Sequence, residues 1–190
     1  MMQKNLLKYL RLSSNKINSK NIFDIVVYGS SVKSKENPND LDIVIIFLNE
    51  KLDNMLKIAQ EYKNIIKDKI KNPDVKAINL IEFFDKNFLA REGILLEGYS
   101  VFYEEPFSSR LGFKGYVIYC YSLKKLNHNE KTKFTYALIG RRSEGILKKV
   151  NAIILGKGAV AVPIENSVFF EDFLKKWNVD YKIKKTLISI

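Results

Sequence analysis

Val26-Val27-Tyr28-Gly29-Ser30 and Asp40-Leu41-Asp42, with nine residues between them, are the stretches that decide the fold. The first stretch closes the run 22–28, which predicts a buried strand because it is rich in β-branched and aromatic residues. Glycine breaks that strand, and the polar segment after it predicts a loop. The second stretch opens the apolar run 41–48, which predicts another buried strand. A glycine-serine pair therefore ends one strand, and two acids begin the next.

The glycine-serine pair and the two acids together suit the binding of a metal-bound triphosphate. Asp40 and Asp42 are two residues apart on an extended segment, so their carboxylates share one side, ~6–7 Å apart along the chain. Two such charges are costly together unless a cation lies between them. Gly29 lets the backbone approach a bound group closely, and Ser30 offers a hydroxyl and an N–H group. If a helical turn begins there, its N-terminus attracts phosphate.

The remaining periodicities predict alternating helices and strands. A three- and four-residue apolar repeat predicts a long helix, and Gly156-Lys157-Gly158 between apolar runs predicts a β-hairpin. Cys120 falls within a strand and is expected to be a small core residue. The expected helices are 51–72, 85–97, 129–139, 143–150 and 167–177, and the further strands are 75–81, 101–103, 116–121, 152–155, 159–162 and 179–184.

Composition excludes several classes of protein. The chain has 190 residues, of which 46% are hydrophobic and 28% charged, as in ordinary globular domains. No apolar run approaches the ~20 residues of a membrane helix. Cys120 is the one cysteine and His128 the one histidine, which excludes a disulfide framework, a multi-cysteine zinc site and a His-cluster centre. A bound metal should therefore be a hard ion held by carboxylates.

The net charge of +11 is unevenly distributed. Residues 1–104 hold 16 Lys/Arg and 14 Asp/Glu, a balance of +2, whereas residues 105–190 hold 16 and 7, a balance of +9. The second part is thus the expected place for contact with a polyanion. Lysine, isoleucine and asparagine are abundant throughout, however, so charge alone leaves nucleic-acid contact and plain composition bias equally open.

The N-terminal segment 1–23 is basic and has no acid before Asp24. It has no apolar core of 7–15 residues, which excludes a secretory signal. A transit peptide or a membrane-surface helix would share its charge. We favour a helix that packs on the domain, because Leu6, Tyr9 and Leu10 fall on one helical face.

The arrangement from Val26 to Asp42 resembles the minimal nucleotidyltransferases of the DNA polymerase β superfamily, over about residues 22–104. The resemblance implies that Gly29 and Ser30 bind phosphates and that Asp40 and Asp42 ligate Mg²⁺. The order of a long helix, a third strand and a further helix also looks like the family. A basic residue often follows the glycine-serine pair, and Lys33 is its nearest equivalent here, with Lys35 as the alternative.

One position departs from the family pattern. The family has a third carboxylate on its third strand, and the matching segment here, Ile78-Asn79-Leu80-Ile81, has Asn79 instead. An amide can ligate through its carbonyl, but it carries no charge and cannot take a proton. Glu82 and Asp74 are nearby; on the expected strand the former points to the opposite face and the latter precedes it. Catalysis would then fall to Asp40, Asp42 and Asn79.

The order of strands and helices predicts the fold class α/β (α+β), with a small mixed sheet covered by helices on one face and a second small α/β domain. The resemblance implies that this mixed sheet is of the nucleotidyltransferase type. We expect residues 1–104 to form the first domain with its N-terminal helix, and residues 105–190 the basic one. The implied activity is transfer of a nucleoside monophosphate from an NTP such as ATP to a hydroxyl, with Mg²⁺ or Mn²⁺ as cofactor.

The acceptor stays open at this stage. RNA, a protein side chain and a small molecule are the candidates, and the basic charge favours a polyanion over a cationic drug. Expected partners are the NTP, then tRNA, another RNA or DNA, or a partner protein, in the cytoplasm and without a membrane. The alternatives are a catalytically degenerate module that binds nucleic acid or protein, for which Asn79 speaks, and an antitoxin-like regulator with a helical partner.

Overall fold

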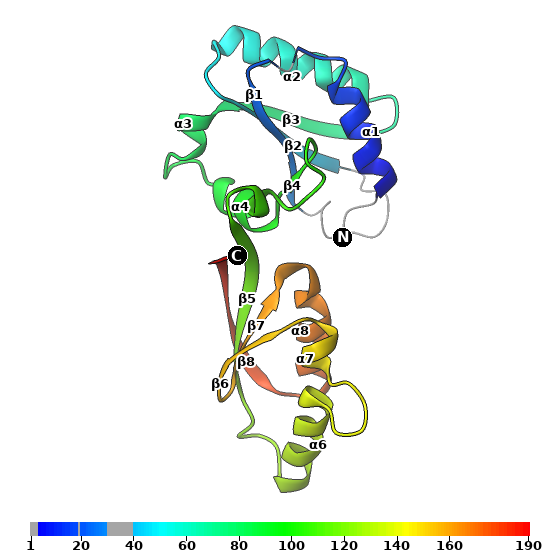
Figure 1. Cartoon of the computed structure of the whole chain (residues 1–190), viewed down its shortest axis with the longest axis vertical. Helices are drawn as coiled ribbons and strands as arrows, with labels where there is room; N and C mark the ends of the chain where they lie inside the picture. The colour runs from blue at the N-terminus through cyan, green and yellow to red at the C-terminus, as the bar shows by residue number, and fades with distance from the viewer. Residues whose placement is uncertain (1–3, 19, 30–39) are drawn as a thin grey trace. The chain divides into compact units, whose positions relative to one another are not determined.

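The computed structural model describes residues 4–18, 20–29 and 40–190, which form two compact units, Met1–Gly112 and Phe113–Ile190. Each unit has its own sheet (Figure 1). The predicted α/β class, with a second small α/β domain, is confirmed. Residues 105–112 cluster with the first unit rather than the second, because Phe107 is fully buried there against Val26 and Val44.

The first unit is built around a four-stranded mixed sheet. Its strands lie in the order β3-β2-β1-β4. β1 is antiparallel to β2 and to β4, whereas β2 and β3 are parallel. The elements are α1 (Lys4–Ser14), β1 (Ile22–Tyr28), β2 (Asp40–Phe47), α2 (Leu52–Ile66), β3 (Asn72–Asn79), α3 (Leu80–Phe83), α4 (Arg91–Glu97), β4 (Tyr99–Ser100) and α5 (Phe107–Arg110).

Helices cover both faces of this sheet rather than one. Residues at odd positions of β1 and β2, such as Ile25 and Ile43, pack with α1 and α2. Those at even positions, such as Val26 and Val44, pack with side chains from α3, α4 and α5. Strands that are apolar at consecutive positions need cover on both sides, and this explains the second layer of helices.

The N-terminal helix packs on the domain, as the favoured interpretation predicted. Leu10 of α1 is fully buried in the cluster with α2. The Tyr9 hydroxyl donates a hydrogen bond of 3.0 Å to the carbonyl of Ile65, and Tyr62 of α2 donates one of the same length to the carbonyl of Leu10. These bonds fix α1 against α2.

The third strand and the helices beside it differ from the prediction. The helix expected over 51–72 ends at Ile66, and β3 begins at Asn72 rather than at Val75. The apolar periodicity continues through Ile70, which is buried but lies outside the helix. β3 ends at Asn79, because that residue starts α3 through reciprocal bonds with Glu82. Expected helix 85–97 is helical only from Arg91, and the short strand lies at 99–100.

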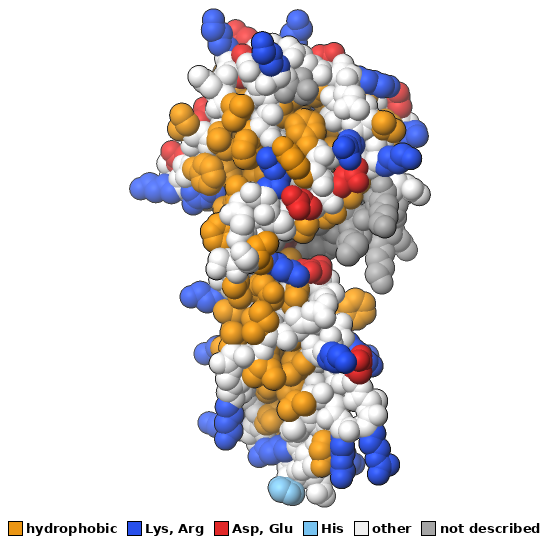
Figure 2. Space-filling model, in the orientation of Figure 1, with side chains coloured by type: hydrophobic (Ala, Val, Ile, Leu, Met, Phe, Trp, Pro, Cys, Tyr) orange, Lys and Arg blue, Asp and Glu red, His pale blue; other side chains and the backbone are white. Residues whose placement is uncertain are grey.

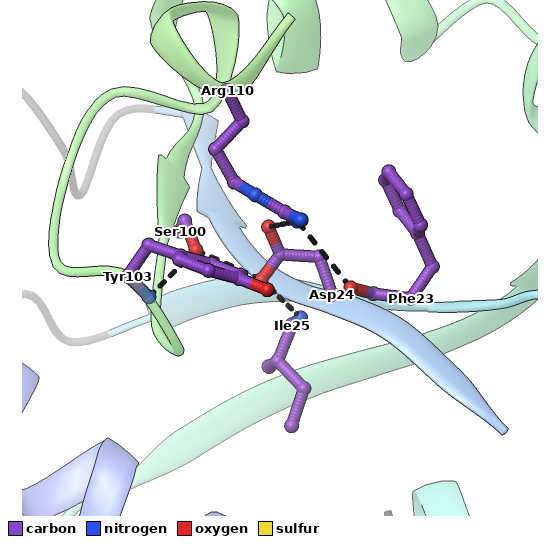
Figure 3. Close-up of polar contacts among 6 residues, drawn as sticks. All are labelled: Phe23, Asp24, Ile25, Ser100, Tyr103 and Arg110. Carbon is purple, nitrogen blue, oxygen red and sulfur yellow. Dashed lines mark hydrogen bonds and ion pairs between the residues drawn. The ribbon is translucent and has the colours of Figure 1, made fainter. Parts of the chain in front are cut away.

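A buried ion pair ties α5 to the centre of the first sheet (Figure 3). Asp24 of β1 has a fully buried side chain, and its Oδ2 accepts a 2.8 Å bond from Nη1 of Arg110. Its Oδ1 accepts bonds from the Ser100 hydroxyl at 2.9 Å and the Ile25 amide at 2.8 Å. The Arg110 guanidinium lies 3.7 Å from the ring centroid of Tyr103. Burial raises the pKa of Asp24, and the bond from Arg110 opposes that rise.

We expect Arg110→Met to lower the free energy of unfolding by about 3 kcal/mol, because it leaves the Asp24 carboxylate buried without its partner. Urea denaturation measures this. The matched control is Arg11→Met, whose bond to Glu104 joins side chains that are 54% and 42% exposed, and which should cost less than about 1 kcal/mol. Equal losses in the two variants would contradict the importance of the buried pair.

The second unit is an antiparallel sheet with helices on one face. Its strands lie in the order β6-β7-β5-β8, and the chain runs strand, helices, two strands, helix, strand, which is the split βαβ arrangement. Val117 and Tyr119 of β5 pack against the helices around Phe134 and Phe170. The elements are β5 (Phe113–Ser122), α6 (His128–Ile139), α7 (Ile146–Lys149), β6 (Ile153–Gly156), β7 (Ala159–Pro163), α8 (Ser167–Lys176) and β8 (Asp180–Ser189).

The other face of this sheet carries no helix of the unit. Cys120, expected in the core, is exposed on that face, because it alternates with Val117 and Tyr119, which point to the helices. The predicted hairpin is present as β6 and β7. Figure 2 shows hydrophobic side chains in a band over the second unit, with lysine and arginine side chains along its borders.

Among the described residues, no helix has both the length and the apolar character that a membrane crossing requires.

Candidate active site

The start of β2 and the start of β3 place acidic side chains side by side. In the parallel register Asp40 pairs with Asn72, and Asp42 pairs with Asp74. In-register residues of neighbouring strands point to the same face, so all four side chains share one side of the sheet. The Asn72 amide donates a 3.1 Å bond to Oδ1 of Asp40. The register therefore groups Asp40, Asp42 and Asp74 at one corner of the sheet.

Gly29 follows the end of β1 and faces this corner. It has a φ of +79°, which favours glycine, and a Cβ at this position would lie 2.5 Å from Oδ2 of Asp42. Tyr28 pairs with Asp42 across the antiparallel strands. Any side chain at position 29 would thus push the Asp42 carboxylate from its place, and glycine is the residue that keeps it there.

A cation of the protein lies beside the acids. Lys76, two residues after Asp74, has its Nζ 3.5 Å from Oδ2 of that aspartate. Tyr28 and then Asp74 raise the pKa of Lys76, so the ammonium stays charged through the neutral range. Burial raises the pKa of Tyr28, while Lys76 opposes the rise and Asp42 adds to it. The corner is therefore a charged group of three acids, a lysine and a protonated tyrosine.

Asn79 does not reach this corner. It pairs with Phe47 at the far end of the strand, five residues from Asp74, which is ~17 Å along the chain. The odd offset also puts its side chain on the other face. Its Oδ1 accepts a 2.9 Å bond from the Glu50 amide, and its Nδ2 donates to the Glu50 carbonyl at 3.1 Å. The structure thus gives Asn79 a role in closing the strand and starting α3.

Asp74 is the residue that the sequence reasoning misplaced. The strand was expected to begin after it, because Pro73 reads as a breaker. Pro73 instead sits within β3 in register with Leu41, and β3 lies at the edge of the sheet, where proline is tolerated. The available signal was Asp42, which is partly exposed and lies opposite Asp74 in the parallel register.

Two predicted phosphate-binding residues, Ser30 and Lys33, lie outside the described residues, as does the alternative Lys35. Of the predicted set, the structure brings together Gly29 and Asp42, with Asp40 on the same strand face. Within the described parts of the chain, no three His, Cys, Asp or Glu side chains are already gathered tightly enough to hold a metal ion.

Comparison with known families finds a match for the first part of the chain. Residues 12–98 match the family model described as "Polymerase beta, Nucleotidyltransferase". These residues are therefore similar to the nucleotidyltransferase domain of the polymerase beta family. The resemblance seen in the sequence is thereby confirmed, and the domain supports a transferase-type enzyme that acts on a nucleotide. The match ends near β4 and does not reach the second unit. No curated protein matches the chain.

The residues of this nucleotidyltransferase-like domain fit a divalent cation. Carboxylate oxygens are the donors that Mg²⁺ and Mn²⁺ prefer, and Asp40, Asp42 and Asp74 supply them from two adjacent strands. Gly29 leaves the approach to Asp42 free of a side chain. The site therefore has the donor chemistry that a metal-bound nucleotide needs.

We expect Gly29→Ala to lower the rate of nucleotidyl transfer by about tenfold or more, because its Cβ would displace the Asp42 carboxylate. Gly112→Ala is the matched control: its φ is +77°, and nothing lies within 4 Å of the added Cβ, so it carries similar backbone strain without the clash. Steady-state kcat/KM for both variants checks this. An equal effect in the two would show that strain alone is responsible.

We expect Asp74→Asn to lower transfer by about a hundredfold or more while the fold is kept, since a surface carboxylate is replaced by its isostere. Asn79→Ala should instead lower the unfolding free energy by about 1 kcal/mol through loss of the helix cap, with kcat retained at low temperature. Transfer assays and thermal unfolding of both variants distinguish the two positions. The opposite pattern would return the third ligand position to Asn79.

Proposed function

We propose that the chain moves a nucleoside monophosphate from an NTP to a hydroxyl acceptor with the help of Mg²⁺ or Mn²⁺. The observation that carries the proposal is the in-register pair Asp42 and Asp74 beside Gly29, in a part of the chain that matches the nucleotidyltransferase family. Asp40, on the same strand face as Asp42, completes the set. We extend the phosphate-binding role to Ser30 and Lys33 on sequence grounds.

In the proposed reaction the acceptor oxygen attacks the α-phosphorus in line. The new bond joins that oxygen to phosphorus, the bond between the α- and β-phosphates breaks, and pyrophosphate leaves with its electron pair. The bound divalent cation would neutralise the phosphate charge and stabilise the attacking and leaving oxygens. Asp74, half exposed, is the carboxylate available to accept the hydroxyl proton.

The protein would contribute mainly positioning. Asp42 is held by strand pairing on both sides, with Tyr28 on one neighbour and Asp74 on the other. Lys76 restrains the Asp74 carboxylate through its 3.5 Å ion pair. Like charges on adjacent strands repel, so cation binding would draw the acids together as the nucleotide arrives. A rigid sheet with a few movable carboxylates suits this ordered assembly.

The alternative of a catalytically degenerate module depended on Asn79 in place of a carboxylate. Asp74 supplies a carboxylate at the register position of Asp42, so that alternative loses its main support. For the acceptor we keep RNA or a protein side chain, with the positive second unit in favour of RNA. The NTP supply also favours the expected cytoplasmic location.

Asp42→Asn should abolish metal-dependent transfer, because the variant loses the central carboxylate but keeps the shape of the side chain. Incubation with radiolabelled ATP or CTP, Mg²⁺ and bulk RNA measures labelled product. Asp68→Asn, an exposed acid after α2, is the control for loss of one charge and should keep full activity. Undiminished Mg²⁺-dependent labelling by Asp42→Asn would refute the proposed site.

A further inference from the structure

The helix-free face of the second sheet is cationic along one edge and apolar in the middle. Lys182 of β8 pairs with Cys120 of β5, and Lys184 pairs with Ile118. On its other side, β5 pairs with β7: Cys120 lies opposite Ala159, and Ile118 lies opposite Ala161. We call this surface the lysine-edged face and define it by these residues: Ile118, Cys120, Ala159, Lys182 and Lys184.

The orientation of this face follows from the core. Tyr119 and Val117 point into the helix-covered cluster, so their neighbours Cys120 and Ile118 point the other way. Lys182 and Lys184 are both exposed and stand two positions apart on one strand, ~7 Å from each other. Ala161 of β7 is fully buried, so the accessible apolar surface beside the two ammonium groups consists of the exposed Cys120 and the partly exposed Ile118 and Ala159.

Among the described residues, Lys182 and Lys184 have no acidic partner, whereas most acids of the second unit are engaged. Within residues 113–190, all of which the structure describes, there are 15 Lys/Arg and 6 Asp/Glu, a balance of +9. Four of the acids form ion pairs with lysines, and a fifth caps α6. Neither Lys182 nor Lys184 takes part in an ion pair among the described residues. The surplus charge at this edge is therefore available to an external anion.

We propose that the lysine-edged face binds single-stranded nucleic acid, with phosphates along Lys182 and Lys184 and bases over the apolar surface beside them. A single strand has phosphates on one side and exposed bases on the other, which matches a cationic edge beside apolar residues. A duplex hides its bases and could use the lysines only. A second copy of the chain would bring two positive edges together. This inference deepens the proposed function, on which it rests for the identity of the acceptor.

The closing experiment compares two double variants with equal loss of charge. Lys182→Gln with Lys184→Gln removes the charged edge, whereas Lys131→Gln with Lys133→Gln removes two exposed lysines of α6, in the helix layer. Fluorescence anisotropy over a salt series, with single-stranded RNA, single-stranded DNA and duplex DNA, measures affinity. The edge variant should lose about tenfold in single-strand affinity, and its salt slope should become shallower by about 1.4. The α6 variant should bind like the wild type.

Cys120 provides an independent readout on the same face. It is the one cysteine of the chain and is exposed, next to Lys182 across the strands. Saturating single-stranded nucleic acid should slow its reaction with a neutral maleimide several-fold, and duplex DNA should do so less. Equal affinity loss in both double variants, or tight binding with unchanged maleimide rates, would overturn the assignment of the face.

The two proposals fail in different ways. Asp42→Asn should keep wild-type single-strand affinity and Cys120 protection, because the lysine-edged face belongs to the other unit. Binding with protection but without transfer in the wild type would contradict the proposed function and support this inference. Transfer without single-strand binding would contradict the inference alone. Preference for RNA or DNA follows from the two single-strand arms of the titration.

Discussion

The parallel pairing of β2 with β3 is the constraint on which the candidate active site depends. It fixes which side chains of two strands meet, and it brings Asp42 beside Asp74 and Asp40 beside Asn72. A shift of one residue would turn one set of acids to the opposite face. The register is itself held by the apolar positions further along, where Ile43 and Ile45 are fully buried on one face and Val44 and Ile46 on the other.

One face of the first sheet changes character along its length. Val44 and Ile46 of β2 lie under the helices α3, α4 and α5, whereas Asp42 is partly exposed and Asp40 exposed. The covered end gives rigidity through the buried pair of Asp24 and Arg110, and the open end presents the carboxylates. Rigid support for polar groups at an uncovered end suits the proposed transfer site, because positioning lowers the barrier of such reactions.

The sequence predicted the strands β1 and β2, the glycine between them and the two acids, because burial patterns and turn residues are local properties. The start of β3 was misplaced because an edge strand can include a proline such as Pro73. The end of α2 was misplaced because Ile70 continues the apolar repeat, although it is buried outside the helix. Asn79 was predicted as a ligand from its place on the third strand. In the structure it bonds to Glu50 and Glu82 instead, and these bonds end β3 and start α3. Cys120 was misjudged for a related reason: one face of the second sheet has no helix layer, and no local pattern says which face that is.

The two borders of the second sheet differ in how they could accept another strand. β8 carries lysines, which discourage edge-to-edge pairing. β6 has no charged residue, and Ile153, Ile154 and Leu155 are between 43% and 62% exposed. On the side of β6 that faces away from β7, the N–H and C=O groups are not flanked by lysine side chains of that strand. The two edges of the sheet therefore differ: the lysines of β8 oppose pairing with an additional strand, whereas β6 has no charged side chain that would oppose it.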